Sequence, residues 1–212
     1  RTGGLVLKAA YPFFPKKTIH LGVVDPGVGG GRRGVILEDK EGNQFVGPDN
    51  GLFSFALEQE GVRVFEVNNQ EWILAEPSST FHGRDIFAPV VARLASGSLP
   101  SEAGPEISDA VIHSLPVPFW EVDEEEQYVQ IYGIVLHVDR FGNLITNIDR
   151  NFFAKASENR KILSAHLILG NRKVADLIGY YEEVDDLSSG ALFNSWGLLE
   201  VFVSSGNASR DL

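Results

Sequence analysis

Cysteine and methionine are both absent from the 212 residues of this sequence. The lack of cysteine excludes disulfide bonds and cysteine metal sites. No apolar run reaches the roughly 18 residues that a membrane span requires, so we expect no transmembrane helix. No signal peptide is visible, and we expect a cytoplasmic protein.

Basic residues are fewer than acidic residues in this sequence. The chain has 18 Lys and Arg against 29 Asp and Glu, which gives a formal net charge of -11. This balance opposes binding to nucleic-acid phosphates and to anionic membranes, so we expect neither as a partner. Apolar residues make up 43% of the sequence, enough for the core of one large domain or two small ones.

The sequence starts at Arg1 rather than at a methionine. A natural reading frame starts with Met. Residues 4–10 also have the pattern of a helix tail that lacks its start signal. We therefore expect the chain to be a fragment or a processed product.

The first half alternates strand and helix patterns, which is typical of an α/β sheet. Strands are expected at residues 18–24, 34–38 and 62–67. A short helix is expected at residues 52–60, between a turn at Asp49–Gly51 and the terminating Gly61. A second helix is expected from about residue 85 to 96, with Pro89 in its first turn.

The composition changes half-way along the chain. Residues 116–120 are restricted by proline, and five acids crowd residues 121–126, as in a solvated linker or strand edge. Strands then dominate, with one short helix at residues 151–156. The expected strands cover residues 128–138, 143–148, 163–169, 172–177 and 198–204. We predict an α/β N-terminal domain with a central sheet over residues 1–118 and a small all-β, barrel-like C-terminal domain over residues 128–212.

The most informative segment is Val24–Arg33, a glycine-rich loop that follows an apolar strand. Asp25 lies where that strand ends, and ligands usually bind at the ends of strands in α/β sheets. An aspartate beside Arg32 stays ionised and oriented. Ordinary turn chemistry also explains Asp-Pro-Gly, so the loop alone leaves both interpretations open. The loop has neither the Gly-Lys-Ser/Thr of a P-loop nor the last glycine of the dinucleotide fingerprint.

A second candidate segment, Ser79–Asp85, precedes the predicted second helix. His82 is a candidate for proton transfer or for orienting a hydrogen bond. Taken alone, the segment favours a simpler interpretation, in which Asp85 caps the helix and His82 packs. Asp25, Asp49, His82 and Asp85 offer metal ligands, but without cysteine or a His-x-x-x-His pair this signal is weak.

Two motifs in the second half combine aromatic, acidic and amide side chains. Asp139–Asn147 follows a long strand and suits a purine or an amino-acid head group. Phe193–Glu200 offers a similar mixture near the C-terminus. Each motif is equally explained as a hairpin turn.

Four motifs in a fixed order resemble the S-adenosyl-L-methionine (SAM) hydroxide adenosyltransferases, also called SAM hydrolases. The motifs are Val24–Gly29 with Arg32 and Arg33, Val46–Leu52, Phe81–Pro89 and Asp139–Asn147. The resemblance covers nearly the whole chain. It implies an α/β N-terminal domain, a β-barrel C-terminal domain, and a homotrimer with sites between the N-terminal domain of one subunit and the C-terminal domain of the next.

The resemblance also implies the catalytic residues. The hydrolytic branch carries an Asp, Arg and His triad, which corresponds to Asp25, Arg32 and His82. The related fluorinating and chlorinating enzymes have a tyrosine near the position of Asp25, Tyr-Ser in place of His82 and Gly83, and an extra loop that this sequence lacks. The resemblance therefore implies hydrolysis of SAM to adenosine and L-methionine, by attack of an activated water or hydroxide on C5′.

The resemblance places most substrate contacts in the second half. The implied substrate-binding residues are Asp25, Asp139, Phe141, Asn143, Ser195, Trp196, Glu200 and Val203. Phe141 offers a stacking face and Asn143 an amide edge for adenine. Asp139 and Glu200 suit the positive ammonium or sulfonium. No cofactor or metal is expected, because the sulfonium already activates its leaving group.

Three alternatives stay open at this point. They are an adenosine or SAM binding protein without turnover, a halogenating relative that uses a halide, and a metal-dependent hydrolase. The first is kept because the family begins with an Asp-Phe-Gly segment, a strand and a helix before the position of Arg1. An acid in that segment resembles a ribose ligand, and its absence would weaken the substrate pocket.

Overall fold

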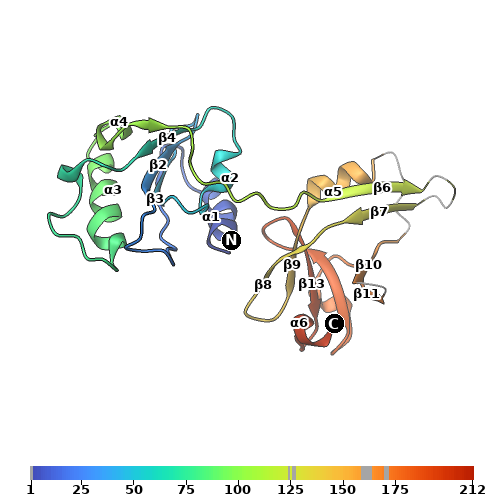
Figure 1. Cartoon of the computed structure of the whole chain (residues 1–212). Helices are drawn as coiled ribbons and strands as arrows, with labels where there is room; N and C mark the ends of the chain where they lie inside the picture. Colours follow the sequence, from blue (N-terminus) through green and yellow to red (C-terminus); the bar gives the residue numbers. More distant parts are fainter. Residues whose placement is uncertain (1, 124, 126–127, 159–163, 170–171) are drawn as a thin grey trace. The chain divides into compact units, whose positions relative to one another are not determined.

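The computed structural model describes residues 2–123, 125, 128–158, 164–169 and 172–212 (Figure 1). The chain divides into two compact units, Arg1–Ser114 and Leu115–Leu212. The start of the predicted strand 163–169 and part of the acidic run 121–126 lie outside the described residues. Within the described part of the chain, no helix combines the length and apolar character that crossing a bilayer requires.

The first unit contains a five-stranded mixed sheet with the order β1-β3-β2-β4-β5. Its strands are β1 (Ile19–Leu21), β2 (Gly34–Glu38), β3 (Gln44–Pro48), β4 (Arg63–Glu66) and β5 (Glu106–Ile107). β1 and β3 are parallel, whereas the other neighbours are antiparallel. The predicted strand 34–38 is confirmed, the strand predicted at 18–24 is shorter, and β3 was not predicted.

Helices lie around this sheet. They are α1 (Thr2–Ala10), α2 (Ser54–Leu57), α3 (Ala88–Ala95) and α4 (Pro100–Ala103). The predicted helix 85–96 begins earlier, because a π-helical turn at Gly83–Phe87 leads directly into α3. Pro89 lies in the first turn of α3, where its missing N–H is tolerated. The helix predicted at 52–60 is reduced to α2.

The sheet of the first unit buries side chains on both faces. Along β2, Ile36 points to one face and Val35 and Leu37 to the other, as strand alternation requires. Ile36 packs in a cluster with Val90 of α3. Val35 and Leu37 pack in a second cluster that includes α2 and side chains of α1. The first unit is therefore a layered α/β structure.

A buried histidine on β1 makes this core sensitive to pH. The His20 ring is 7% exposed and stacks on Phe45, with ring centroids 5.0 Å apart. Its Nε2 atom is buried and has no hydrogen-bond partner in the described structure. Burial lowers the pKa of His20 below its usual value of 6.5, and Asp39 only partly opposes this effect. The folded unit therefore holds His20 in its neutral form.

We expect the free energy of unfolding to fall as the pH drops below about 6.5, because the unfolded chain then takes up a proton that folded His20 resists. Above that pH, the neutral His20 ring makes its full contribution to the free energy of unfolding. This contribution decreases as the pH falls from 6.5 to the lower pKa of His20 in the folded protein. Replacing His20 with Phe keeps the ring and removes the titration. The pH-dependent loss between about pH 7.5 and 5 should then be smaller in the variant than in the wild type, measured by urea unfolding at each pH. An equal pH slope in both proteins would contradict this assignment.

The second unit contains a curled six-stranded sheet with the order β10-β11-β12-β13-β9-β8 and a two-stranded ribbon, β6-β7 (Figure 1). The strands are β6 (Phe119–Asp123), β7 (Tyr128–Tyr132), β8 (Val135–Val138), β9 (Leu144–Asp149), β10 (His166–Leu169), β11 (Arg172–Leu177), β12 (Ser189–Phe193) and β13 (Leu198–Val203). Two short helices, α5 (Arg150–Ala156) and α6 (Ala208–Asp211), accompany it. This unit is therefore dominated by strands, as predicted.

The single strand predicted at residues 128–138 is two strands in different sheets. Gly133 and Ile134 separate β7 from β8. A side chain at Gly133 would collide with Asn147 and Ile148, and Asn147 accepts a 2.7 Å hydrogen bond from the Ile134 amide. The close approach of β9 therefore ends the strand at this glycine.

Candidate active site

Asp25 follows β1 on a loop that several contacts hold in place. Gly22 continues the pairing of β1 with β3, and the Asn50 side chain donates to the Val24 carbonyl at 2.9 Å. Gly29 has a φ of +78°, and any side chain there would collide with the Ser79 carbonyl oxygen. The loop therefore needs glycine where it passes the segment that leads to His82.

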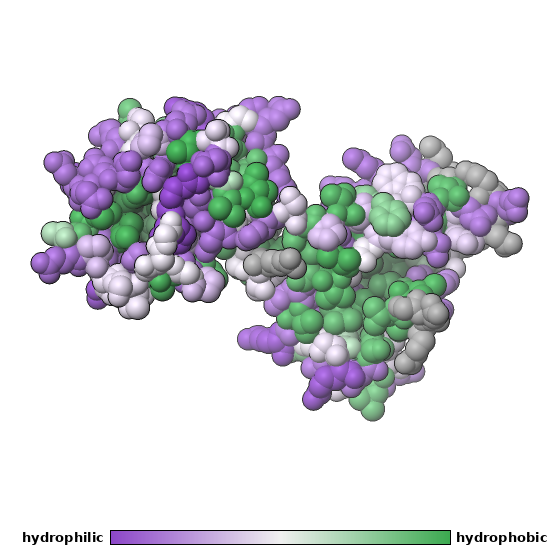
Figure 2. Space-filling model, in the orientation of Figure 1, coloured by the Kyte–Doolittle hydropathy of each residue, from purple (hydrophilic) through white to green (hydrophobic). Residues whose placement is uncertain are grey.

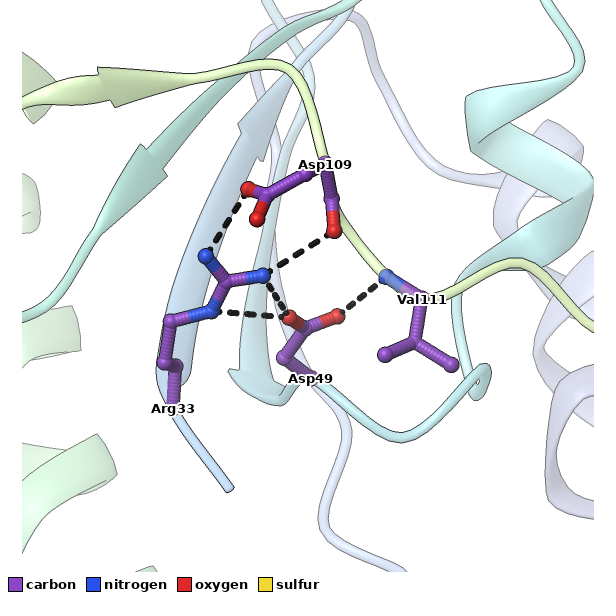
Figure 3. Close-up of polar contacts among 4 residues, drawn as sticks. All are labelled: Arg33, Asp49, Asp109 and Val111. Atoms are coloured by element: carbon purple, nitrogen blue, oxygen red, sulfur yellow. Dashed lines mark hydrogen bonds and ion pairs between the residues drawn. The ribbon is translucent and has the colours of Figure 1, made fainter. Parts of the chain in front are cut away.

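Arg32 and Arg33 precede β2 and serve different partners. Figure 3 shows that Arg33 donates to Asp49, with its Nη2 2.8 Å from Oδ2, and to Asp109, with its Nη1 2.8 Å from Oδ1. Asp49 also accepts a 2.7 Å bond from the Val111 amide. This clamp fixes the backbone at the start of β2, and with it the origin of the Arg32 side chain.

The segment that carries His82 is held by Asp85, which is fully buried in the turn Gly83–Phe87. Asp85 accepts from the Arg84 guanidinium at 2.5 Å and from the Ser78 amide at 2.7 Å. These bonds, that of Arg84 first, lower the pKa of Asp85 below its usual value. A permanent carboxylate therefore ties residues 78–85 together at the base of α3.

Asp25, Arg32 and His82 come together in the first unit. Nε and Nη2 of Arg32 donate to Oδ2 of Asp25 at 2.8 and 2.5 Å. The same Nη2 lies 2.6 Å from Nδ1 of His82. The Asp25 and Arg32 side chains are only 5% and 12% exposed, and the guanidinium lies over the Phe87 ring at 5.2 Å. One buried arginine thus orients both other groups.

The hydrogen bonds show which atoms of the triad act as donors and which act as acceptors. An arginine is only a donor, so Nδ1 of His82 accepts and the proton of the neutral ring lies on Nε2. Oδ1 of Asp25 is buried and has no hydrogen-bond partner among the described residues. The site therefore offers a fixed, unpartnered carboxylate oxygen, which can bind and accept a proton from a water or hydroxyl group.

In the structure, each of the four side chains that the sequence offered as metal ligands contacts an arginine. Asp49 is engaged by Arg33 and Asp85 by Arg84. In the ranges that the structure describes, no three His, Asp or Glu side chains are gathered as a metal site would require. Asp25 and His82 face each other through Arg32 instead.

The second unit presents its candidates on two turns. In the first, Oδ1 of Asp139 accepts from the amides of Phe141 and Asn143 at 2.8 and 2.9 Å. Phe141 is 61% exposed, and Arg140 stacks on its ring. An exposed aromatic face and an amide side chain therefore lie next to each other, while one oxygen of Asp139 closes the turn.

The second turn is closed by Asn194 and carries Ser195 and Trp196. Oδ1 of Asn194 accepts from the amides of Trp196 and Leu198 at 2.9 and 3.2 Å. Ser195 is exposed, and Trp196 is 37% exposed. Both predicted ligand residues on this turn are therefore accessible.

Glu200 on β13 links the two turns. Its side chain is buried and accepts from Asn143 at 3.0 Å, from Asn194 at 3.0 Å and from the Tyr181 hydroxyl at 2.8 Å. Sequence reasoning predicted that Glu200 binds a positively charged group of the ligand. In the structure, both oxygens of its carboxylate instead accept hydrogen bonds from other side chains of the protein. Val203 lies in the core cluster of the second unit, with Leu144 and Val201.

The predicted residues thus form two groups, one in each unit. Asp25, Arg32 and His82 are in contact in the first unit, and Glu200 connects the turns of Asn143 and Asn194 in the second. Sequence reasoning missed Tyr181, for which the doublet Tyr180–Tyr181 in an acidic stretch was the only signal. It also missed the part that Asn194 plays in closing its turn.

Comparisons with known proteins identify the family of this chain. The SAM hydroxide adenosyltransferase N-terminal domain matches residues 1–104, and the C-terminal domain of the same family matches residues 133–212. The chain belongs to the SAM hydroxide adenosyltransferase family. The recognition made from the four sequence motifs is therefore confirmed.

Several named proteins are similar in sequence to this chain. A protein named (R)-S-adenosyl-L-methionine hydrolase from Salinispora tropica is 45% identical over 68% of this chain and 54% of its own length. One of the same name from Methanocaldococcus jannaschii is 33% identical over 98% of this chain and 72% of its length. A fluorinase from an Actinoplanes species is 30% identical over 68% of this chain and 55% of its length. The chain therefore spans little more than half of the Salinispora relative.

Solved structures share the fold. The crystal structure of an uncharacterized conserved protein from Thermotoga maritima is 34% identical and has a TM-score of 0.82. The match covers 98% of this chain and 78% of that protein.

Proposed function

We propose that this chain hydrolyses SAM to adenosine and L-methionine. The observation that carries the proposal is the buried Asp25–Arg32–His82 arrangement with its unpartnered Oδ1. Family membership supports it, as do relatives named (R)-S-adenosyl-L-methionine hydrolase at 33 and 45% identity. The fluorinase match, at 30% identity, is weaker.

In the proposed reaction, a water bound at Oδ1 of Asp25 attacks C5′ of the ribose in line with the C5′–S bond. As the C5′–O bond forms, the C5′–S bond breaks and its electron pair returns to sulfur, which leaves as neutral methionine. The water proton passes to Asp25 and then to solvent. Holding the water in line contributes several kcal/mol to the rate enhancement. No cofactor or metal is required, because the sulfonium is already an activated leaving group.

The charge at the nucleophile position favours water over a halide. Oδ1 of Asp25 is a negative, buried atom that no group in the described part of the chain contacts by a hydrogen bond. A halide placed beside it would be repelled, and the low dielectric of a buried site strengthens that repulsion. A water molecule has a proton to donate to the same atom. The halogenating alternative is therefore the weaker one.

For the substrate, we propose that the two turns of the second unit bind the adenosine and methionine parts of SAM. Phe141 offers its exposed ring to the purine, and Asn143 offers its amide edge. The Asp139 oxygen that does not close the turn and the exposed Ser195 suit the methionine ammonium and carboxylate. Glu200 does not contact the substrate in this proposal; it orients Asn143 through a hydrogen bond.

Incubating the purified chain with SAM and following adenosine and methionine by chromatography tests the function directly. Adenosine release that persists with a chelator supports the proposal. Binding without turnover would instead favour the binding-protein alternative, and loss of activity with the chelator would favour a metal-dependent hydrolase. A 5′-halogenated product formed with added halide would favour the halogenating alternative.

We further propose that the predicted domains, residues 1–118 and 128–212, form each site across the subunits of a homotrimer. Figure 2 shows apolar surface on the second unit, and its edge strands carry exposed apolar side chains. On β8 these are Val135 and Val138, and on β10 they are Ile168 and Leu169. Exposed apolar side chains on sheet edges suit burial in an assembly.

Co-expressing an Asp25→Asn chain with an Asn143→Ala chain tests this arrangement. Each chain keeps one intact half of the site, so a site shared between neighbours is complete at one position in three of every mixed trimer. We expect about a third of the wild-type activity, measured as adenosine release from the doubly tagged assembly, which contains only mixed trimers. If each site lies within one chain, the mixture stays as inactive as its parts.

A further inference from the structure

Glu200 collects hydrogen bonds from three separate segments of the second unit. Oε1 accepts from the Tyr181 hydroxyl at 2.8 Å and from Nδ2 of Asn143 at 3.0 Å. Oε2 accepts from Nδ2 of Asn194 at 3.0 Å. The carboxylate is only 4% exposed, so these donors replace the water that the charge would otherwise require. We call these four residues the Glu200 network.

The network decides which atoms the two asparagines present. Asn194 is fixed on both sides, because its Oδ1 accepts the amides of Trp196 and Leu198 while its Nδ2 donates to Glu200. Asn143 donates through Nδ2, so its Oδ1 must point away from the carboxylate. Within the described residues that Oδ1 receives no hydrogen bond. Glu200 therefore makes Asn143 present a carbonyl oxygen as an acceptor.

Tyr181 completes the network from a short 3₁₀ helix, Tyr181–Glu183, that no sequence motif covers. Its ring packs edge-on against Phe202 at 4.8 Å, while its hydroxyl reaches Glu200. Burial and the hydrogen bond to Glu200 raise the pKa of Tyr181 to about 12. The hydroxyl is therefore a permanent donor, and it shares Oε1 with Asn143.

We infer that Tyr181 is a positioning residue of the adenine site, which acts through Glu200 to set the amide orientation of Asn143. This inference rests on the proposed function for the identity of the ligand. An acceptor at Oδ1 pairs with the 6-amino group of adenine, and the second Nδ2 proton can pair with an adjacent ring nitrogen. A purine with a 6-oxo group would place an acceptor against Oδ1 and be rejected.

Without the Tyr181 hydroxyl, Oε1 of Glu200 loses one of its two donors. Asn143 or a water molecule can then move to replace that hydrogen bond, and the orientation of the Asn143 amide changes. The Tyr181→Phe variant makes this change and keeps the ring packed on Phe202. We expect its affinity for adenosine to fall about tenfold and its preference for adenosine over inosine to narrow by a similar factor. KM for SAM should rise, whereas kcat should change less than about twofold, because the triad is untouched.

The matched control is Tyr180→Phe. Tyr180 is the neighbouring tyrosine, its ring is 62% exposed, and its hydroxyl is not among the three donors to Glu200. Calorimetry gives the Kd of adenosine and of inosine for each variant. The side-chain amide signals of Asn143 and Asn194 in ¹H–¹⁵N spectra of the free protein report the network without any ligand. We expect these signals to shift in Tyr181→Phe and to stay in place in Tyr180→Phe.

Three outcomes would overturn the inference. They are unchanged amide signals in Tyr181→Phe, an unchanged ratio of adenosine to inosine affinity, and a wild-type chain that binds no adenosine. A lower melting temperature with an unchanged ratio would make Tyr181 a packing residue only. If the wild-type chain binds adenosine but releases none from SAM, the proposed hydrolysis fails while the positioning role of Tyr181 stands on the binding data.

Discussion

Replacing Asp25 with asparagine should lower kcat for SAM hydrolysis about 10³-fold and leave the fold intact. Oδ2 of Asp25 receives both hydrogen bonds from Arg32, so the amide oxygen of asparagine will take that place. The NH2 group then replaces the unpartnered Oδ1. A donor would stand where the attacking water needs an acceptor, and a positioned base of this kind is worth about 10² to 10⁴ in rate.

The matched control for this variant is Asp109→Asn. Asp109 also binds an arginine, Arg33, but its side chain is 75% exposed. We expect that variant to retain nearly full activity. Steady-state adenosine release gives kcat, and thermal unfolding by circular dichroism verifies the fold. Wild-type turnover in a folded Asp25→Asn protein would remove Asp25 from the mechanism and leave the role of Oδ1 unsupported.

The elements that sequence reasoning found are those with an unambiguous local pattern. β2 is a run of apolar residues in which every second side chain faces the same cluster, and its bounds were predicted correctly. β3 was missed because Gly47 and Pro48 have the composition of a turn, although both are buried in the sheet. β12 was missed because Gly190 and Ala191 carry little strand signal; their neighbours on β11 and β13 determine the strand.

The site shows a similar division. The motifs contain both Arg32 and Arg33, and the resemblance assigned only Arg32 to the triad. The structure shows Arg32 in contact with Asp25 and His82, and it adds the role of Arg33, which holds Asp49 and Asp109. Sequence reasoning had given Arg33 no partner, because Asp109 lies far from it along the chain. Tyr181 lies 19 positions before Glu200, and no local spacing relates the two.

Replacing Arg32 with lysine should lower kcat about 10²-fold. A lysine keeps the positive charge but has no planar fork, so it cannot hold Oδ2 of Asp25 and Nδ1 of His82 in the present geometry. Arg32→Ala is a different experiment, because it leaves the Asp25 carboxylate buried and unpaired. We expect that variant to lose about 3 to 5 kcal/mol of stability, measured by urea unfolding. Arg33→Lys is the comparison, because Arg33 contacts Asp49 and Asp109 and reaches the triad only through the backbone before β2. Its kcat should therefore fall much less, to within about threefold of wild type.

A double-mutant cycle shows whether Arg32 acts by orienting its two partners. His82→Ala alone should lower kcat less than Asp25→Asn and affect adenosine binding little, because the proposed role of His82 is to complete the hydrogen bonds around the attacking water. If Arg32 works through His82, the ammonium of Arg32→Lys has already released the ring, and adding His82→Ala costs little more. The double variant should then lose less activity than the product of the two single losses, by about tenfold. Fully multiplicative losses would mean that the 2.6 Å contact between Nη2 of Arg32 and Nδ1 of His82 has no part in turnover.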